Sequence, residues 1–170
     1  PARDEWLLFT DADTRHAPDG PARAVAHVVR HQLDGLSLFL KQECHGAIDR
    51  LALTTAYAGL FAGIDPQDTL LNGQYILLRR DVYAASGGFA AVRDIALEDV
   101  AFGHRLRRLG FHVPVLLDQE AAQVRMYDNT LDAWHGMNRL GADSLRWSGL
   151  RAVATALFVT ALVSPLVTLL

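Results

Sequence analysis

The sequence predicts an α/β fold that is joined to a membrane segment. Residues 5–10 form a short apolar run typical of a buried strand, and residues 22–33 carry apolar side chains at helical spacing until Gly35 ends the helix. Residues 36–40 then read as a second buried strand. Strand, helix and strand with short connections are the rhythm of an α/β protein. The membrane segment is predicted from residues 152–170, which carry no charged side chain.

Composition narrows the class further. The chain has 170 residues, which allows one domain and little more at roughly 150 residues per domain. Hydrophobic residues make up 51% and charged residues 21%, and this balance excludes a disordered chain. The single cysteine, Cys44, excludes a disulfide framework and a cysteine-rich zinc site. The formal net charge is −3, so no overall basic field attracts nucleic acid, and none is expected as a partner.

The other elements are predicted from turn residues and apolar spacing. In chain order they are a turn at 18–21 that starts the first helix, a turn and strand at 72–80, a short helix at 81–86 closed by two glycines, a helix at 98–109 that ends at Gly110, and a strand at 111–117. Pro114 breaks the last strand and predicts an edge position, because proline cannot donate a ladder hydrogen bond. Residues 51–64 are uncharged but too short to span a bilayer, so a buried helix and a membrane-surface segment both fit them.

The C-terminal part of the chain is predicted to be membrane-associated. As a helix, residues 152–170 would span about 28 Å, close to the roughly 30 Å hydrocarbon core of a bilayer. The preceding segment, 131–151, mixes tryptophan, leucine and arginine like an amphipathic helix at a membrane interface. Positive charge on this side places the catalytic part at the cytoplasmic face of the inner, or cell, membrane. A buried core helix and an ordinary surface helix are the alternatives for these two segments.

Asp11 and Asp13 are the first candidates for chemistry. They follow the apolar run at 5–10, at the carboxyl end of a predicted strand, where residues two apart point to the same side. Two carboxylates with open positions suit Mg²⁺ or Mn²⁺ bound jointly with phosphate groups. The structural alternative is a turn at the end of the strand, where aspartate is a common residue.

Two further groups carry charge that suits the same chemistry. Glu98 and Asp99 open the predicted helix at 98–109. Acids at this position complement the helix dipole, or, if they face the first acidic pair, one of them can take a proton from an incoming hydroxyl. Arg125 follows later, and a guanidinium binds phosphate oxygens through paired hydrogen bonds. No single group identifies a function, but their order along the chain is informative.

In this order the motifs resemble those of membrane-bound family 2 glycosyltransferases. The matching segments are FTDADT at 9–14, NGQYILLRRDVY at 72–83, SGGF at 86–89, ALEDVAFGHRLRRLGFHV at 96–113 and VRMY at 124–127. An interface segment and a membrane span follow them, as in that family. Such enzymes have a GT-A fold, which is a Rossmann-like mixed α/β sheet with flanking helices. The resemblance covers most of the chain and implies this fold here.

The resemblance implies how the donor would be held. Asp11 and Asp13 would bind a divalent metal, Mg²⁺ or Mn²⁺, against the diphosphate of a nucleotide sugar. Arg125 would bind the same diphosphate and offset the charge that builds on it. The donor partner implied is therefore a nucleotide sugar.

The resemblance also implies an acceptor side. Asp99 would be the general base that deprotonates the acceptor hydroxyl, with Glu98 beside it. Gly87, Gly88 and Phe89 would line the acceptor site. A single base and a single displacement would invert the configuration of the sugar, and the membrane segment fits a lipid or membrane-associated acceptor.

Two departures from the family pattern matter. Processive members such as cellulose and hyaluronan synthases end with QxxRW, whereas here Met126 follows Arg125 and Ala122 stands at the glutamine position. The VRMY form is closer to non-processive lipid or carotenoid glycosyltransferases. The chain also lacks the first half of a GT-A domain, so we expect it to be inactive alone. The expected parts are the C-terminal half of that domain at 1–130, an interface segment at 131–151 and a truncated transmembrane helix at 152–170.

The sequence thus predicts an inverting, metal-dependent glycosyltransferase of hexosyltransferase type. One alternative is a non-catalytic, membrane-anchored remnant or scaffold, because half of the catalytic domain is absent. Another is a phosphatase of the haloacid dehalogenase type, but that motif requires threonine or valine where Arg15 stands.

Overall fold

The structure is a computed structural model that describes residues 4–44, 46, 50, 53–54, 70–95 and 97–125. The chain divides into two compact units, and the first, residues 1–43 and 67–126, holds all of the elements named below. Within the described ranges, no helix has the length and apolar character needed to cross a bilayer. The predicted segments at 131–151 and 152–170, and most of 51–64, lie outside these ranges.

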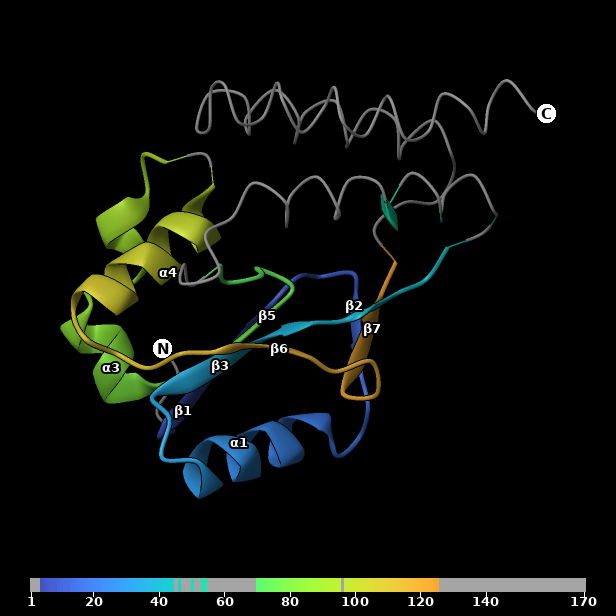
Figure 1. The fold of residues 1–170 in the computed structure, drawn as a ribbon, viewed down its shortest axis with the longest axis horizontal. Helices are drawn as coiled ribbons and strands as arrows, with labels where there is room; N and C mark the ends of the chain where they lie inside the picture. The colour runs from blue at the N-terminus through green and yellow to red at the C-terminus, as the bar shows by residue number, and fades with distance from the viewer. Residues whose placement is uncertain are drawn as a thin grey trace. The chain divides into compact units, whose positions relative to one another are not determined.

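The main sheet has four strands in the order β1-β5-β3-β6 (Figure 1). They are β1 (Trp6–Thr10), β5 (Tyr75–Arg79), β3 (Gly35–Phe39) and β6 (Val115–Leu117). Strand β5 is antiparallel to β1 and to β3, whereas β6 runs parallel to β3. The predicted mixed α/β sheet is therefore confirmed. Strand β6 lies at the edge, as Pro114 predicts, although it begins only at Val115.

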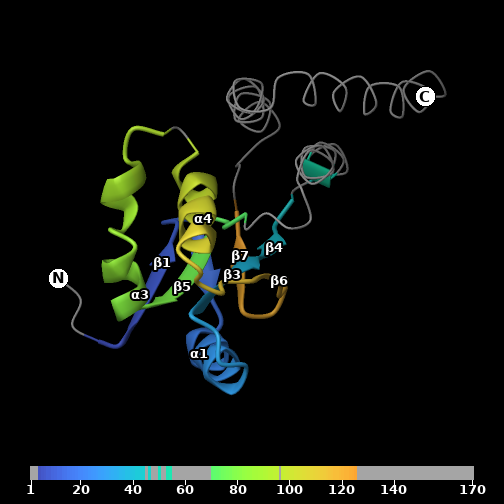
Figure 2. The ribbon, with the colours of Figure 1, turned by 60° about the vertical axis from the view of Figure 1, so that its left-hand side comes forward.

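Helices cover both faces of this sheet. Helix α1 (Gly20–Arg30) lies on one side, and α3 (Arg80–Ala85) and α4 (Glu98–Arg108) lie on the other (Figures 1 and 2). Alternate side chains of β5 enter the two cores, because successive residues of a strand point to opposite faces. Tyr75 and Leu77 pack in the core beneath α1, whereas Ile76 and Leu78 pack with α3, α4 and the short 3₁₀ helix η1 (Phe89–Val92).

A second, smaller sheet follows the carboxyl ends of three main strands. Its order is β2-β7-β4, with β2 (Thr14–His16), β7 (Ala122–Val124) and β4 (Lys41–Gln42). Strands β2, β4 and β7 come next in the chain after β1, β3 and β6, respectively. The sequence did not predict this sheet. The second sheet brings together the segments that follow β1, β3 and β6, at the end of the main sheet where Asp11 and Asp13 lie.

The structure corrects the predicted end of the first helix. The helix begins after Asp19, as predicted, but it ends at Arg30, and the chain reverses at Gln32, whose φ is 53°. Gly35, predicted to stop the helix, is instead the first residue of β3. A Cβ there would lie 2.4 Å from the carbonyl oxygen of Leu77, so glycine is required for the close approach of β3 and β5. The helices predicted at 81–86 and 98–109 are confirmed as α3 and α4, each displaced by no more than one residue.

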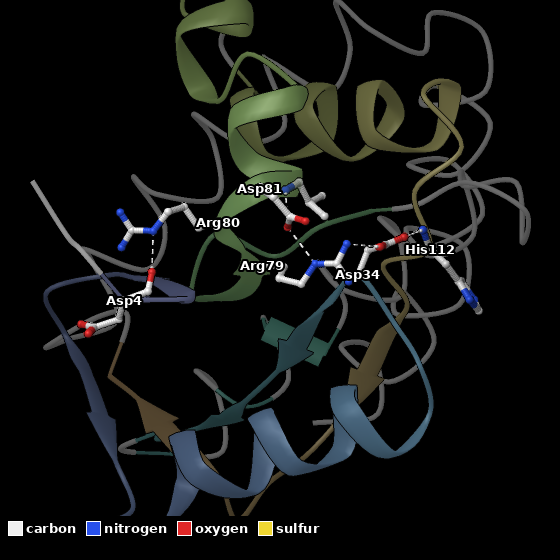
Figure 3. Close-up of polar contacts among 7 residues, drawn as sticks. Asp4, Asp34, Arg79, Arg80, Asp81 and His112 are labelled. Atoms are coloured by element: carbon white, nitrogen blue, oxygen red, sulfur yellow. Dashed lines mark hydrogen bonds and ion pairs between the residues drawn. The ribbon is translucent and has the colours of Figure 1, made fainter.

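Asp34 links two segments at the end of the main sheet that lies away from Asp11 and Asp13 (Figure 3). One of its carboxylate oxygens accepts the backbone N–H of His112 at 2.8 Å, and the other lies 3.5 Å from Arg79. Arg79 also pairs with Asp81 at 2.7 Å. In the β1–β5 ladder Arg79 is opposite Trp6, whereas Tyr75 is opposite Thr10, so this network lies at the end of the sheet away from Asp11.

Candidate functional site

Asp11 and Asp13 lie in a turn between β1 and β2. Strand β1 ends at Thr10, and the backbone N–H of Thr14 closes the turn by donating to the carbonyl oxygen of Asp11 at 3.2 Å. Both acidic side chains are exposed. The strand predicted before the acidic pair is confirmed as β1. The two acids lie in a turn, as the structural alternative predicts, and not in an extended strand.

Arg125 lies beside this turn. Strand β7 is antiparallel to β2, and Val124 is opposite Thr14. Because the strands are antiparallel, Asp13 precedes Thr14 at the same end of the ladder at which Arg125 follows Val124. The guanidinium of Arg125 lies 3.9 Å from a carboxylate oxygen of Glu43, and 42% of the Arg125 side chain is exposed. An accessible arginine next to an acidic turn is suitably placed to bind an anion that a metal also holds.

Asp99 lies in the first turn of α4, and both of its carboxylate oxygens accept hydrogen bonds. Oδ1 accepts the backbone N–H of Val100 at 2.8 Å, which is a local bond within the helix terminus. Oδ2 accepts the backbone N–H of Gly73 at 3.0 Å, and these residues are 26 positions apart in the chain. Asp99 thus accepts a free N–H group at the helix terminus, as the structural alternative predicts. It also accepts a hydrogen bond from a turn that is distant in the sequence. Glu98 beside it is exposed.

The two acidic motifs lie within electrostatic reach of each other. The pKa of Asp11 is raised, first by loss of solvent around its carboxyl group and then by the negative charges of Asp13, Asp99 and Glu98. Burial is also the main cause that raises the pKa of Asp99, and the charge of Glu98 adds to it, while the hydrogen bonds from Val100 and Gly73 oppose it. The fold therefore gathers four carboxyl groups from two separate segments.

These acids fit a divalent cation that is shared with a ligand. Among the residues that the structure describes, no group of three or more histidine, cysteine or acidic side chains is placed to hold a metal ion. A metal enclosed entirely by these side chains is thus not indicated. Magnesium, however, is commonly held by one or two carboxylates together with substrate phosphates, and Asp11 and Asp13 supply two carboxylates at an exposed turn with an excess of negative charge.

The segment Gly87–Phe89 forms the turn between α3 and η1. Gly87 and Gly88 have φ values of 78° and 59°, and Gly88 combines this φ with a ψ of −165°, a region that is essentially restricted to glycine. A Cβ at Gly88 would also lie 2.5 Å from the ring of Tyr83. The backbone N–H of Phe89 donates to the Tyr83 hydroxyl at 3.3 Å. Both glycines are therefore required by the geometry of this turn.

Aromatic contacts join this turn to the acidic one. The ring of Phe9, two residues before Asp11, lies 5.2 Å from that of Phe89 and 5.0 Å from that of Tyr83, measured between centroids. The ring of Phe89 also lies 4.6 Å from that of Phe102 in α4. The predicted acceptor-side segment is thus packed against both elements that carry acids.

The turn at Asn72–Gln74 is a part of the site that the sequence did not predict as functional. Besides the Gly73 bond to Asp99, its Gln74 carbonyl oxygen accepts the hydroxyl of Thr14 at 3.5 Å. The turn thus contacts both acidic motifs. The sequence NGQ predicts a turn here, but a backbone donor leaves no side-chain pattern by which its partner could be found.

Comparison with known families assigns the chain to a class of enzyme. A family model described as glycosyl transferase family 21 matches residues 1–170. No curated protein gives a significant match. The glycosyltransferase predicted from the motifs is confirmed, but the family is 21, not family 2 as the motif resemblance indicated. The chain belongs to glycosyl transferase family 21.

Proposed function

We propose that this chain carries the metal-binding, base and acceptor-side residues of an inverting, metal-dependent glycosyltransferase. Membership of the family assigns glycosyl transfer, and the proposal adds the residues that perform it. The observation that supports it most is the gathering of Asp11, Asp13, Glu98 and Asp99, with Asp99 partly buried and held by Gly73. A carboxylate whose pKa is raised accepts a proton more readily than one in open solvent.

The proposed reaction is a single displacement at the anomeric carbon of the sugar. The acceptor hydroxyl oxygen attacks the anomeric carbon from the side opposite the diphosphate. A new carbon–oxygen bond forms while the bond between the anomeric carbon and the diphosphate oxygen breaks, and the departing oxygen keeps the electron pair. The hydroxyl proton moves to Asp99. Its two hydrogen bonds leave lone pairs available, since a carboxylate has about four acceptor sites. One displacement inverts the anomeric carbon.

Donor binding is assigned to the acidic turn and its neighbour. Asp11 and Asp13 would hold Mg²⁺ or Mn²⁺ with the diphosphate of a nucleotide sugar, and the bound ion would supply charge stabilisation for the leaving group. Arg125 would bind the same diphosphate, and the carboxylate of Glu43 lies 3.9 Å from its guanidinium. Glu98 adds negative charge near Asp99 and favours proton acceptance there.

The acceptor is proposed to be a lipid or another membrane-associated molecule. Gly87, Gly88 and Phe89 form the acceptor side, and this turn packs against the elements that carry Asp11 and Asp99. The uncharged segment 152–170 and the amphipathic segment 131–151 support a location on the cytoplasmic face of the cell membrane.

A transfer assay with matched variants tests the proposal. The full protein is incubated with a panel of nucleotide sugars, Mn²⁺ and solubilised membrane lipid as acceptor. Asp13→Ala is expected to abolish metal-dependent transfer. Asp99→Asn is expected to lower kcat about 100-fold or more while donor affinity is retained. Asp94→Asn is the control, because Asp94 is an exposed acid whose neighbour is Arg93, and it should keep wild-type rates.

Two outcomes would contradict the proposal. Normal turnover by Asp99→Asn refutes the assignment of the base. Absence of transfer by the wild-type protein with every donor favours the alternative of a non-catalytic remnant.

A further inference from the structure

The Asn72–Gln74 turn holds Asp99 through a backbone group, which requires the turn itself to be fixed. The N–H of Gly73 reaches Oδ2 of Asp99 at 3.0 Å. A Cβ on Gly73 would lie 3.4 Å from the same oxygen, so the carboxylate lies directly over this residue. A small displacement of the turn would therefore reorient the Asp99 carboxylate.

Ser37 fixes the start of the turn from inside the main sheet. Its side chain, in β3, is fully buried, and its Oγ accepts the backbone N–H of Asn72 at 2.8 Å. The same hydroxyl donates to the carbonyl oxygen of Tyr75 at 3.0 Å. Because Asn72 begins the turn and Tyr75 follows it, one buried hydroxyl holds both ends of the turn. The N–H of Tyr75 also donates to the carbonyl oxygen of Asn72 at 3.1 Å and closes the turn.

Asn72 fixes the turn from the side. Its Nδ2 donates to the carbonyl oxygen of Leu38 at 3.0 Å and lies 3.2 Å from Oε1 of Gln74. Its Oδ1 accepts the backbone N–H of Gln74 at 3.3 Å. Gln42, from β4, donates to the same Oε1 of Gln74 at 3.0 Å. Side chains from two strands thus meet at this turn of three residues, which reaches Asp99 through the backbone N–H of Gly73.

We propose that Ser37 and Asn72 are positioning residues for glycosyl transfer, which hold the Gly73 N–H against Asp99 and so orient the carboxylate that receives the acceptor proton. This inference rests on the proposed role of Asp99. The alternative is that the network only shapes the loop before β5. The two differ in prediction, because a positioning role affects turnover through Asp99, whereas a loop-shaping role affects folding alone.

A double-mutant cycle in the full protein separates them. Ser37→Ala and Asn72→Ala are each combined with Asp99→Asn and assayed with the nucleotide sugar that gives transfer to solubilised membrane lipid. With Asp99 present, each variant is expected to lower kcat about 10- to 100-fold and to leave the donor KM within about twofold. With Asn at position 99, neither is expected to lower kcat further. Tyr75→Phe is the control, since it removes the hydroxyl of the residue that follows the turn, and this buried hydroxyl makes no hydrogen bond to a described residue.

A second measurement reads the structure directly. The hydrogen-exchange rate of the Gly73 amide, followed by NMR, is expected to rise at least tenfold in Ser37→Ala, in Asn72→Ala and in Asp99→Asn, but not in Tyr75→Phe. If Asp99→Asn loses turnover while both positioning variants keep it, the inference is wrong and the proposed base stands. Equal losses in the two backgrounds also overturn it. If Asp99→Asn itself keeps normal turnover, the proposed function fails first. Asn72 is only partly buried, so its variant remains informative if Ser37→Ala does not fold.

Discussion

At the scale of single residues, Tyr75 shows how burial changes the chemistry of a side chain. It is the first residue of the inner strand β5 and is fully buried, and burial raises the pKa of its hydroxyl to about 12. The negative charge of Asp118 acts in the same direction, and Arg23 opposes it. The folded protein therefore keeps this hydroxyl neutral at pH values where an unfolded chain would ionise it.

This difference predicts a loss of stability in alkali. The pKa of Tyr75 in the folded protein lies above its unfolded value of 10.0. The contribution of the neutral hydroxyl to the free energy of unfolding is therefore complete below pH 10 and is lost as the pH rises through about 12. Between pH 9 and pH 11.5, the free energy of unfolding of the wild-type chain should fall by about 2 kcal/mol more than that of Tyr75→Phe. Urea unfolding at the two pH values measures this difference. Parallel pH curves for the two proteins would show that Tyr75 ionises equally easily when folded.

The acids of the candidate site could be found from the sequence, but Gly73 could not. Asp11 and Asp13 follow an apolar strand, and Glu98 and Asp99 open a helix, so local patterns mark them. The bond from Gly73 to Asp99 uses a backbone N–H and joins residues 26 positions apart. Only the packing of α4 against the end of the sheet brings them together. No local pattern carries that information.

At the scale of elements, the strands of the main sheet were predictable from apolar runs, whereas those of the second sheet were not. Strands β1, β3 and β5 have five residues each and are apolar enough to be recognised. Strands β2 and β7 have three residues each, too few for an alternating pattern, and they exist because they pair with each other. The end of α1 was misplaced for a related reason. Gln32 adopts a positive φ that the sequence does not mark, whereas Gly35 has a packing role.

The contacts of Asp34 with His112 and Arg79 lead to a prediction of stability. Asp34 binds the His112 N–H in the loop before β6 and pairs with Arg79 at the end of β5 (Figure 3). Asp34→Ala removes both contacts and should lower the free energy of unfolding by about 1–2 kcal/mol. Glu120→Ala is the control, because Glu120 is 86% exposed and its ion pair with Arg23, at 3.7 Å, should contribute less than about 0.5 kcal/mol. Chemical denaturation measures both values, and equal losses would show that the Asp34 contacts add nothing.

At the scale of the whole described unit, the main sheet separates two hydrophobic cores, and only one of them packs against α4, the helix that carries Asp99. The core beneath α1 joins β3, β5 and the segment that leads to β7. The core beneath α3 and α4 contains Phe9, Phe89 and Phe102, which connect the acidic turn, the glycine turn and the helix of Asp99. The position of Asp99 on α4 thus depends on the core beneath α3 and α4. A substitution that loosens this core should therefore lower the rate of glycosyl transfer.

Two core variants of similar cost test this division. Phe102 and Val28 are both fully buried, one in each core, so Phe102→Leu and Val28→Ala should each lower the free energy of unfolding by about 1–3 kcal/mol. Only Phe102→Leu should also lower kcat of the folded protein. The smaller side chain loosens α4 three residues after Asp99 and removes the ring contact with Phe89. The transfer assay is run well below both unfolding midpoints, with the folded fraction checked by circular dichroism. Equal turnover in the two variants would mean that the position of Asp99 does not depend on the core beneath α4, and that the turn at Gly73 alone holds it.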